Sequence, residues 1–598
     1  MKKKQPRNTQ PLSPANSASG QGWAFVHEPD DPSCNPNAKW RVRFRRIELS
    51  GQFEVEIRFR TRSGKWDTIT ISARDRSEFD KIRRELCARD ARLPEDRKAG
   101  LAFVESLIRA TPKQAVQVVS KPGFRDGATG FVMPTRMYGT ANGRFVWDDN
   151  FADPAFGEIK GDLAHYREGV LKPALGSPFL SFAILTALAA TLPSYVEQRD
   201  GRGKLVSEGA IFHHAGESSA GKTLCTRVGQ SVFGSPEALM DYAATARGVA
   251  EACHARNDLL VVLDDTETAA LEDRELFQVM TLVGQRLPSG RSKTIARSAA
   301  KGGLPAMTWF CFGVSTGPET QAELAQRLGR KRHGQKARFL EFVVPCSDKG
   351  GIFARVLGEE QLDVEDAGEL IKVIETAMSQ HHGVLMDAWI PFLFSDDHSE
   401  RVRSMVDKFV ELTAGGEKGL ETRFARKFGV VYAAGLMAVK AGLLPWSTDW
   451  LTKVVRYCYD LARNTRDPDA CAVEAGLQAI AKATRVKSRF VRHKHATGKP
   501  PLFSEPAIGL KICGDGKASW LVCGERIGLI GVKDARIQRL VMEKAKACGF
   551  VKASKNATGS VQIRVRTRHS QVEKLRFWRL NRKALELWLD RRLAEVGE

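Results

Sequence analysis

The sequence lacks the features that mark secreted and membrane proteins. Its 11 cysteines include no Cys-x-x-Cys pair, which argues against a zinc ribbon and a disulfide framework. The longest apolar run, Phe179 to Leu192, is fourteen residues long, too short for a membrane span, so we expect a buried helix there. Met1 to Gly22 is basic and polar, without the apolar stretch of a signal peptide. We therefore expect a cytoplasmic protein with reduced thiols and no membrane partner.

Acidic residues are scarce toward the C-terminus. The net charge is +22 over 598 residues, and the segment from Lys482 to Glu598 holds 27 Lys and Arg against 10 Asp and Glu. Its first part, Lys482 to Lys499, contains no acid at all. A basic domain of this kind favours a polyanion partner, most simply nucleic acid. A solvated basic face and a docking site for an acidic protein are the alternatives.

A glycine-rich segment follows an apolar, strand-like stretch at residues 210–215. It fits the pattern G-x-x-x-x-G-K-[ST], whose glycines let successive backbone N–H groups point at a triphosphate while the next helix adds its positive end. The pattern predicts ATP as the cofactor, with Lys222 on the β- and γ-phosphates and Thr223 on Mg²⁺. An ordinary Gly-Ser turn before a helix is the alternative. The predicted nucleotide-binding residues are Gly216, Glu217, Ser218, Ser219, Ala220, Gly221, Lys222 and Thr223.

Two carboxylates end a second apolar strand, predicted at residues 259–263. In a P-loop ATPase this is the Walker B position, where Asp264 would hold the water shell of Mg²⁺. Asp265 would orient or deprotonate the attacking water, with Glu267 as the reserve candidate. A plain junction between a strand and a loop is the alternative, but the position 42 residues after Lys222 favours the catalytic interpretation.

Two further segments supply candidates for contacts to the γ-phosphate. A third apolar strand is followed by Ser315 and Thr316, and either hydroxyl would reach the γ-phosphate if this strand lies between the other two; we select Ser315. A Ser/Thr turn is the alternative. Phosphoryl transfer also benefits from an arginine, commonly given by a neighbouring subunit. Arg338 directly precedes a predicted strand and is the best candidate, with Arg332 next and a solvated basic turn as the alternative.

Basic residues also occur where contacts with DNA are expected. The segment from Gly290 to Gly303 is basic, free of acids and bounded by glycines, as a hairpin in the central pore of a ring would be. A surface loop is equally compatible with these residues. The strand pattern from Val561 to Arg566 alternates apolar and basic residues. The predicted nucleic-acid contacts are Arg291, Lys293, Arg297, Lys301, Arg564 and Arg566.

The order of the patterns predicts the architecture. Residues 38–75 alternate as antiparallel strands, with five arginines on one face that is either solvated or a nucleic-acid surface. Strands and helices then alternate, which predicts an α/β core, a parallel sheet between two helix layers. The predicted core elements are helices 222–233, 245–256, 272–285 and 319–328 and strands 259–263, 308–314 and 339–344. The predicted later helices are 365–380, 400–413, 420–441 and 447–465.

The C-terminal pattern is a helix at 534–547, strands at 561–566 and 575–580, and a helix at 582–596, which is winged-helix-like. The five arginines on one face of the strands predicted at residues 38–75 are Arg41, Arg43, Arg45, Arg58 and Arg60. The predicted domains are a disordered tail (1–22), an N-terminal α+β region (23–150), a P-loop ATPase core (151–360), a helical lid region (361–480), a basic linker (481–500) and a winged-helix-like nucleic-acid-binding domain (501–598).

Five short patterns together resemble the helicase-like P-loop family catalogued as domain of unknown function 927. The similarity extends from about Pro112 to Arg579 and includes Thr422 to Ala425 in the helical region. The patterns are His214 to Thr223, Asp264-Asp265, Gly284-Gln285 with Arg291, Ser315-Thr316-Gly317-x-Glu319, and Gly334-Gln335-x-x-Arg338.

The resemblance implies an AAA+-like fold related to the superfamily-three and minichromosome-maintenance helicases, which act on DNA as hexameric rings. Members often occur in phage and mobile-element replication proteins, sometimes fused to a primase. The family's acidic strand usually reads Asp-Glu, whereas this chain has Asp264-Asp265. No primase-like motif precedes residue 110, so a separate primase is the expected replication partner.

These observations lead to two hypotheses from different classes. The first is an ATP-dependent DNA helicase or translocase, a homo-hexamer that acts in replication of a mobile element or phage. The second is a DNA-binding switch gated by ATP, such as an initiator or an anti-phage sensor, which hydrolyses slowly and unwinds nothing. The shorter acid at Asp265 is the feature that keeps the second hypothesis open.

Overall fold

The structure is a computed structural model in which two compact units are distinguished, residues 1–459 and residues 460–598. Among the residues it describes, no helix has the length and apolar character needed to cross a bilayer. The described residues are 23–26, 40–48, 50–125, 129–141, 143–148, 156–192, 209–241, 246–266, 271–292, 307–330, 337–354, 364–414, 419–466, 468–494, 499–514, 517–551, 560–566 and 571–597. The predicted tail at 1–22 lies outside them.

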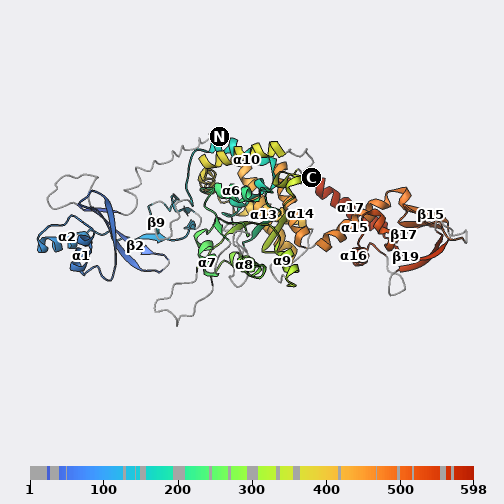
Figure 1. The fold of residues 1–598 in the computed structure, drawn as a ribbon, viewed down its shortest axis with the longest axis horizontal. Coiled ribbons are helices and arrows are strands. Elements are labelled where there is room, and N and C mark those ends of the chain that lie inside the picture. The colour runs from blue at the N-terminus through green and yellow to red at the C-terminus, as the bar shows by residue number, and fades with distance from the viewer. Residues whose placement is uncertain are drawn as a thin grey trace, which may run out of the picture. The chain divides into compact units, whose positions relative to one another are not determined.

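The N-terminal part is a six-stranded sheet covered on one face by two helices (Figure 1). The antiparallel pairing predicted for residues 38–75 is confirmed, because β2, β3 and β4 pair in that order. Buried Trp40, Phe59, Phe103 and Leu107 join the sheet to the helices. The elements are β1 (Ala24–Val26), β2 (Trp40–Ile47), β3 (Phe53–Arg60), β4 (Trp66–Ser72), β5 (Val116–Val119) and β9 (Phe145–Trp147), with helices α1 (Phe79–Ala88) and α2 (Arg97–Arg109).

A small three-stranded sheet connects to the loop that precedes the acidic strand of the core. It consists of β6 (Gly123–Arg125), β7 (Gly130–Val132) and β8 (Met137–Gly139). The backbone N–H of Phe124 donates to Asp258 Oδ2 at 3.1 Å, and Asn257 Nδ2 donates to the Pro122 carbonyl at 2.9 Å. Burial of the Asp258 carboxyl raises its pKa to about 6.

The core is a five-stranded sheet in which each strand pairs in parallel with its neighbours, as the alternation of strands and helices predicts. The strand order is β11, β12, β13, β10, β14, so β13 lies between the strand of the P-loop and the strand of the two acids. The strands are β10 (Ile211–Ala215), β11 (Met240–Asp241), β12 (Leu260–Asp264), β13 (Phe312–Gly317) and β14 (Phe339–Val343).

Helices cover both faces of this sheet. On one face α6 (Lys222–Ser231) contacts β12 and β13, and α4 (Pro178–Ala189) packs on α6. On the other face α7 (Ala246–Ala255), α8 (Asp273–Arg286) and α9 (Gln321–Arg327) share a hydrophobic cluster with β10, β12 and β14. All residues of α4 are buried, which confirms the expectation of a buried helix in the longest apolar run.

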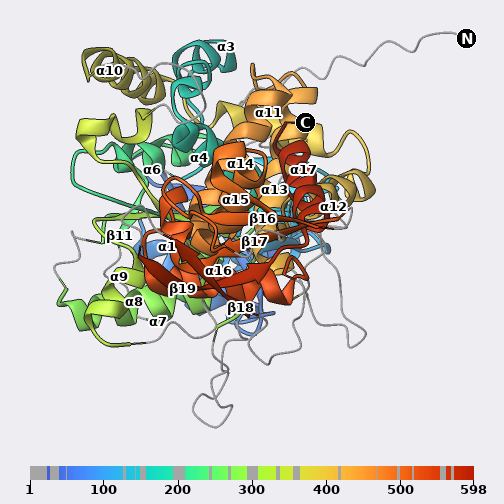
Figure 2. The same cartoon turned by 90° about the vertical axis from the view of Figure 1, so that its right-hand side faces the viewer.

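The helical region after the core contains five helices within the described residues (Figures 1 and 2). Helix α13 packs against both α12 and α4, so it closes the side of the core formed by α4. Helix α11 was not predicted; its sequence is nearly all apolar and contains Pro391, so it shows no amphipathic period. The helices are α10 (Val364–Gln380), α11 (Val384–Leu393), α12 (Ser399–Ala414), α13 (Leu420–Lys440) and α14 (Thr448–Arg466).

The C-terminal unit contains a five-stranded sheet with three helices (Figure 2). Buried Leu477, Ile480, Val541 and Leu585 join the helices in one cluster. The sheet order is β15 (Phe490–Lys494), β16 (Gly509–Gly514), β17 (Lys517–Cys523), β19 (Val572–Arg579) and β18 (Ser560–Arg566). The helices are α15 (Pro468–Thr484), α16 (Ala535–Ala547) and α17 (Arg582–Gly597).

This unit differs from the predicted pattern in its extent. The predicted helix, two strands and final helix correspond to α16, β18, β19 and α17, and Gly549 after α16 adopts a φ of 71°, as a helix-terminating glycine does. The sheet, however, also includes β15, β16 and β17, which were not predicted. β15 lies within the segment 481–500 that was predicted to be a basic linker, and α15 was not predicted either.

The aromatic side chain of Phe182 in α4 provides a test of the core. It is fully buried, with its ring centroid 5.0 Å from that of Phe212 and 5.3 Å from that of Phe342. We expect Phe182→Ala to lower the free energy of unfolding by about 3–5 kcal/mol, because it leaves a cavity between helix and sheet. Urea denaturation followed by tryptophan fluorescence measures this. The control Leu175→Ala, at a position 36% exposed, should cost less than about 1 kcal/mol; equal losses would contradict the assigned packing.

Candidate functional site

The segment predicted to be a P-loop, residues 216–223, connects the end of β10 to the start of α6, and we refer to it as the P-loop. Ser219 and Gly221 adopt φ values of 65° and 85°, and this left-handed backbone lets the chain curl back before the helix begins. Lys222 Nζ donates to the carbonyls of Gly216 at 2.8 Å and Glu217 at 2.6 Å, so the ammonium group lies over the loop. Because Glu217, Ser218 and Ser219 are exposed, the tip of the loop is open to a ligand.

The loop packs against Gly351 and Ile352, which follow β14 in the sequence. The Ile352 backbone N–H donates to the Ala220 carbonyl at 3.0 Å. A Cβ at Gly221 would lie 2.8 Å from Ile352 Cδ1, and a Cβ at Gly351 would lie 2.6 Å from the Ala220 carbonyl oxygen. At Gly351 the close approach of the Ala220 backbone favours glycine, and at Gly221 the φ of 85° does so.

Helix α6 and strands β12 and β13 meet at Asp264. Its Oδ1 accepts a hydrogen bond from Thr226 Oγ1 of α6 at 3.1 Å and one from Thr316 Oγ1 of β13 at 2.9 Å. Thr316 Oγ1 also accepts the backbone N–H of Asp265 at 2.9 Å. The P-loop helix, the acidic strand and the strand between them are thus joined by side chains at the carboxyl edge of the sheet.

The two hydroxyls at the end of β13 point to opposite faces of the sheet. Strand 308–314 was predicted, but β13 runs from Phe312 to Gly317, so Ser315 and Thr316 are consecutive strand residues and alternate in direction. Ser315 is buried and its Oγ lies 2.9 Å from His213 Nδ1, while His213 Nε2 lies 3.0 Å from the Glu319 carbonyl. Of the two hydroxyls considered, Thr316 is therefore the one beside Asp264, and the choice of Ser315 is not supported by this geometry.

Asp265 follows the strand in an unusual conformation. Its φ is 37°, a region that aspartate tolerates better than most residues with a side chain. The reserve candidate, Glu267, lies outside the described residues. The structure thus brings Asp264 and Asp265 to the same edge of the sheet as Lys222 and Thr223, because β10 and β12 flank β13 in parallel.

The start of the basic segment between Gly290 and Gly303 pairs with the residues that precede β13. Arg291 forms an antiparallel bridge with Thr308, and the Ser292 backbone N–H donates to the Met307 carbonyl at 2.9 Å. The two arms therefore run side by side, as the base of a hairpin does. Arg291 is exposed; Lys293, Arg297 and Lys301 lie outside the described residues.

The arginines considered for the γ-phosphate lie in different places. Arg338 precedes β14, and its carbonyl accepts the backbone N–H of Ile211, the first residue of β10. Since the P-loop follows the last residue of β10, Arg338 lies at the opposite edge of the sheet from the P-loop of the same chain. The second candidate, Arg332, lies outside the described residues.

The C-terminal candidates lie on an exposed strand edge. Arg564 and Arg566 are exposed residues of β18, the last strand of its sheet, and the alternating Val565 is buried. In the antiparallel register Arg564 is opposite Lys574 of β19, so two cations are adjacent. The alternation of apolar and basic residues that suggested this strand corresponds only in part to its burial, because Val565 is buried and Ile563 is half-buried but Val561 is exposed.

Two side chains at the site were not selected from the sequence, Thr226 and His213. Thr226 follows Thr223 by three residues, so helical periodicity places both on one side of α6, and this signal was available in the sequence. His213 and His214 had no such signal. The pKa of His214 is lowered to about 3, first by burial and then by the charge of His213.

A family model and a solved structure are similar to this chain. The family model of domain of unknown function 927 matches residues 41–304, whereas the resemblance was expected from about Pro112 to Arg579. The match covers the N-terminal sheet, the P-loop and the acidic strand, and ends before β13. No curated protein matches the chain. The chain is similar to a solved structure named "SCCmec type IV Cch - active helicase" at 13% identity and a TM-score of 0.49, over 91% of this chain and 94% of that chain.

His214 makes stability depend on pH in a defined direction. A histidine that stays neutral when folded, with a pKa near 3, loses stability as the pH falls below its unfolded pKa of about 6.5, because only the unfolded chain then takes up the proton. Between pH 6.5 and 5 this amounts to about 2 kcal/mol. We expect His214→Phe, which fits between the rings of Phe179 and Phe342, to lose this part of the pH dependence in urea denaturation. An unchanged pH dependence would contradict the assignment.

Proposed function

We propose that this protein is an ATP-dependent DNA helicase or translocase that works as a homo-hexameric ring in the replication of a mobile element or phage. The observation that carries the proposal is the pair of hydrogen bonds to Asp264 Oδ1, one from Thr226 of the P-loop helix and one from Thr316 of β13. They join the phosphate loop to the acidic strand and the strand between them, an arrangement suited to hydrolysis at the γ-phosphate.

The residues of the loop fit a bound triphosphate. The left-handed backbone at Ser219 and Gly221 precedes a ten-residue helix, and Lys222 Nζ already lies over the loop carbonyls. Lys222 would neutralise the β- and γ-phosphates, and Thr223 and Asp264 would hold Mg²⁺. Bound Mg²⁺ supplies charge neutralisation at the phosphates. Thr226 and Thr316 orient the Asp264 carboxylate, and Asp265 positions the attacking water.

The position of Arg338 in the sheet is the reason for proposing a ring. At the sheet edge opposite its own P-loop, Arg338 would serve the nucleotide of a neighbouring subunit, as arginines given in trans do in phosphoryl transfer. The basic segment between Arg291 and Thr308 would contact DNA in the pore through Lys293, Arg297 and Lys301. Arg564 and Arg566 would add phosphate contacts from the C-terminal unit.

One observation favours the second function, a DNA-binding switch gated by ATP. The φ of 37° at Asp265 gives aspartate a structural reason to occupy this position, independent of catalysis. Its side chain is one methylene shorter than the glutamate usual at this place. In a switch, ATP binding would alter DNA affinity and hydrolysis would be slow.

The main experiment combines ATP turnover with strand displacement on forked DNA. Lys222→Ala should abolish DNA-stimulated hydrolysis, because the phosphates lose their cation. Lys172→Ala, an exposed lysine paired with Glu168, is the matched control and should hydrolyse as the wild type does. Undiminished hydrolysis in Lys222→Ala would refute the ATPase assignment. Strand displacement by the wild type supports the helicase, and hydrolysis without displacement supports the switch.

A second experiment separates Thr316 from Ser315. Thr316→Val removes a hydrogen bond to Asp264 and should lower kcat for ATP about 10- to 100-fold, as the loss of a supporting bond to a metal ligand does. Ser315→Ala removes the contact to His213 on the other face and should leave kcat within about threefold, with its main effect on stability. A larger fall in kcat for Ser315→Ala would assign the γ-phosphate contact to Ser315.

A further inference from the structure

The outer face of the N-terminal sheet, opposite α1 and α2, carries arginines on neighbouring strands. In the register of β2 and β3, Arg41 is directly opposite Arg58, and in that of β3 and β4, Arg60 is directly opposite Trp66. Like charges opposite each other destabilise a sheet. A face that retains them therefore requires a compensating interaction.

At one end of this face, a carboxylate of the same sheet balances the arginine charges. Arg43 forms a buried ion pair with Glu56, and Arg45 lies 3.4 Å from the same carboxylate. Arg45 is also opposite Glu54 in the register. These two arginines are thus part of the structure of the sheet, which corrects the expectation that all five belong to one solvated or binding face.

At the other end the arginines gather around an aromatic ring. The guanidinium carbons of Arg41, Arg58 and Arg60 lie 4.8, 5.2 and 5.3 Å from the ring centroid of Trp66. Within the described part of the chain, neither Arg58 nor Arg60 forms an ion pair with a carboxylate. Partial burial and then the charges of Arg58 and Arg60 lower the pKa of Arg41, which shows that the cations repel one another. We call Arg41, Arg58, Arg60 and Trp66 the Arg-Trp cluster.

We propose that the Arg-Trp cluster is a binding surface for single-stranded nucleic acid. Cation–π contacts with Trp66 hold the guanidinium groups in place, so fewer side-chain rotations are lost when phosphates bind. Planar guanidinium groups also stack on unpaired bases, which single strands expose and duplexes do not. The choice of nucleic acid as the partner rests on the proposed function. The cluster adds a contact surface that is distant in sequence from the P-loop and from the basic segment between Arg291 and Thr308.

The dimensions of the face favour a single strand over a duplex. The cluster spans β2, β3 and β4, and neighbouring strands lie about 4.8 Å apart. The major groove of DNA admits a helix or a two-stranded ribbon, whereas this face belongs to a wider sheet. A flat sheet face with arginine and tryptophan is suited to an extended strand whose bases lie on it.

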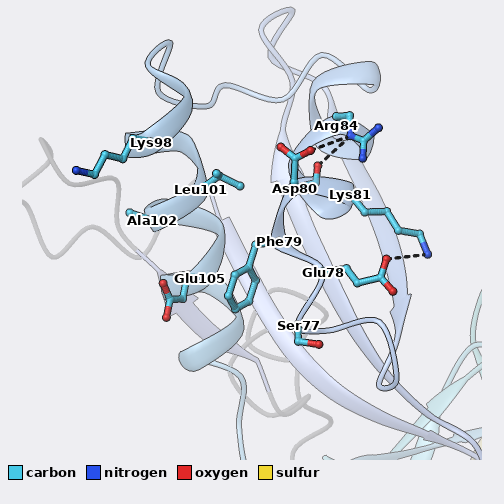
Figure 3. Close-up of a pocket in the computed structure, with 10 residues that line it drawn as sticks. All are labelled: Ser77, Glu78, Phe79, Asp80, Lys81, Arg84, Lys98, Leu101, Ala102 and Glu105. Atoms are coloured by element: carbon cyan, nitrogen blue, oxygen red, sulfur yellow. Dashed lines mark hydrogen bonds and ion pairs between the residues drawn. The ribbon is translucent and has the colours of Figure 1, made fainter.

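The opposite side of this domain has a different charge pattern. A pocket of about 650 Å³ lies between α1 and α2. Figure 3 shows Arg84 and Lys81 of this pocket directed toward acidic side chains. Arg84 lies 3.2 Å from Asp80, and Lys81 lies 3.6 Å from Glu78. Arg84 and Lys81 are thus each paired with an acid within the protein, so Arg84 provides a control for Arg58 and Arg60.

The test measures affinity for a labelled oligothymidylate of about 16 nucleotides, an oligouridylate and a duplex of equal length, as a function of salt and without ATP. The full chain is used, with Arg58→Thr/Arg60→Thr as the variant because threonine suits a strand. Loss of two phosphate contacts should reduce the slope of log affinity against log salt by about 1.4, and affinity at low salt should fall at least about tenfold. Arg58→Lys/Arg60→Lys should keep the slope and still lose affinity, because the planar groups are gone.

Arg84→Thr should match the wild type, and thermal melting checks that each variant is folded. An unchanged slope in the threonine variant would overturn the proposal, and an equal loss on duplex would overturn the assignment to single strands. The two oligonucleotides show whether DNA or RNA is preferred. ATP hydrolysis without DNA should be unaffected in the threonine variant. If the wild type displaces strands but the salt slope of the threonine variant is unchanged, the Arg-Trp cluster is refuted and the helicase assignment is not. A reduced slope without any displacement refutes the helicase and leaves the cluster.

Discussion

The candidate site depends on the order of the parallel strands, with β13 between β10 and β12. Parallel strands deliver their carboxyl ends to one edge, so a residue at the end of β13 can contact the last residue of β12 directly. The hydrogen bond from Thr316 to Asp264 is this contact, and Thr226 adds a second from the helix that follows β10. A different strand order would leave the P-loop and the two acids at one edge without a side chain to couple them.

The rigidity of the loop comes from packing outside the sheet. Ile352 lies against Gly221, and Gly351 approaches the Ala220 carbonyl, so residues that follow β14 hold a loop that follows β10. These strands pair in parallel, and the two segments therefore leave the same edge of the sheet. Behind them, the rings of Phe182, Phe212 and Phe342 fill the space between α4 and the sheet. The tip of the loop from Glu217 to Ser219 is exposed, and the residues that follow it pack against Gly351 and Ile352.

The sequence was sufficient for features that depend on local patterns and insufficient for those that depend on strand ends and pairing. The acidic strand, the parallel sheet and the helices on both of its faces were predicted from apolar periodicity and are observed. The direction of Ser315 was not predicted, because the predicted strand ended at residue 314 and the observed one continues to Gly317. Alternation within those last residues decides which hydroxyl meets Asp264. Likewise β15 was hidden in a basic segment whose composition indicated a linker, since its pairing with β16 is non-local.

The N-terminal sheet illustrates the same limit in a form that bears on function. Its five arginines are equivalent in the sequence, since all fall on the polar side of alternating strands. Pairing divides them: Arg43 and Arg45 meet Glu56, whereas Arg58 and Arg60 meet Trp66. Only cross-strand register makes this distinction, and it changes the energetic meaning of the residues. The charges of Arg43 and Arg45 are balanced by Glu56 in the folded chain, whereas in our proposal the charges of Arg58 and Arg60 are balanced by a bound phosphate backbone.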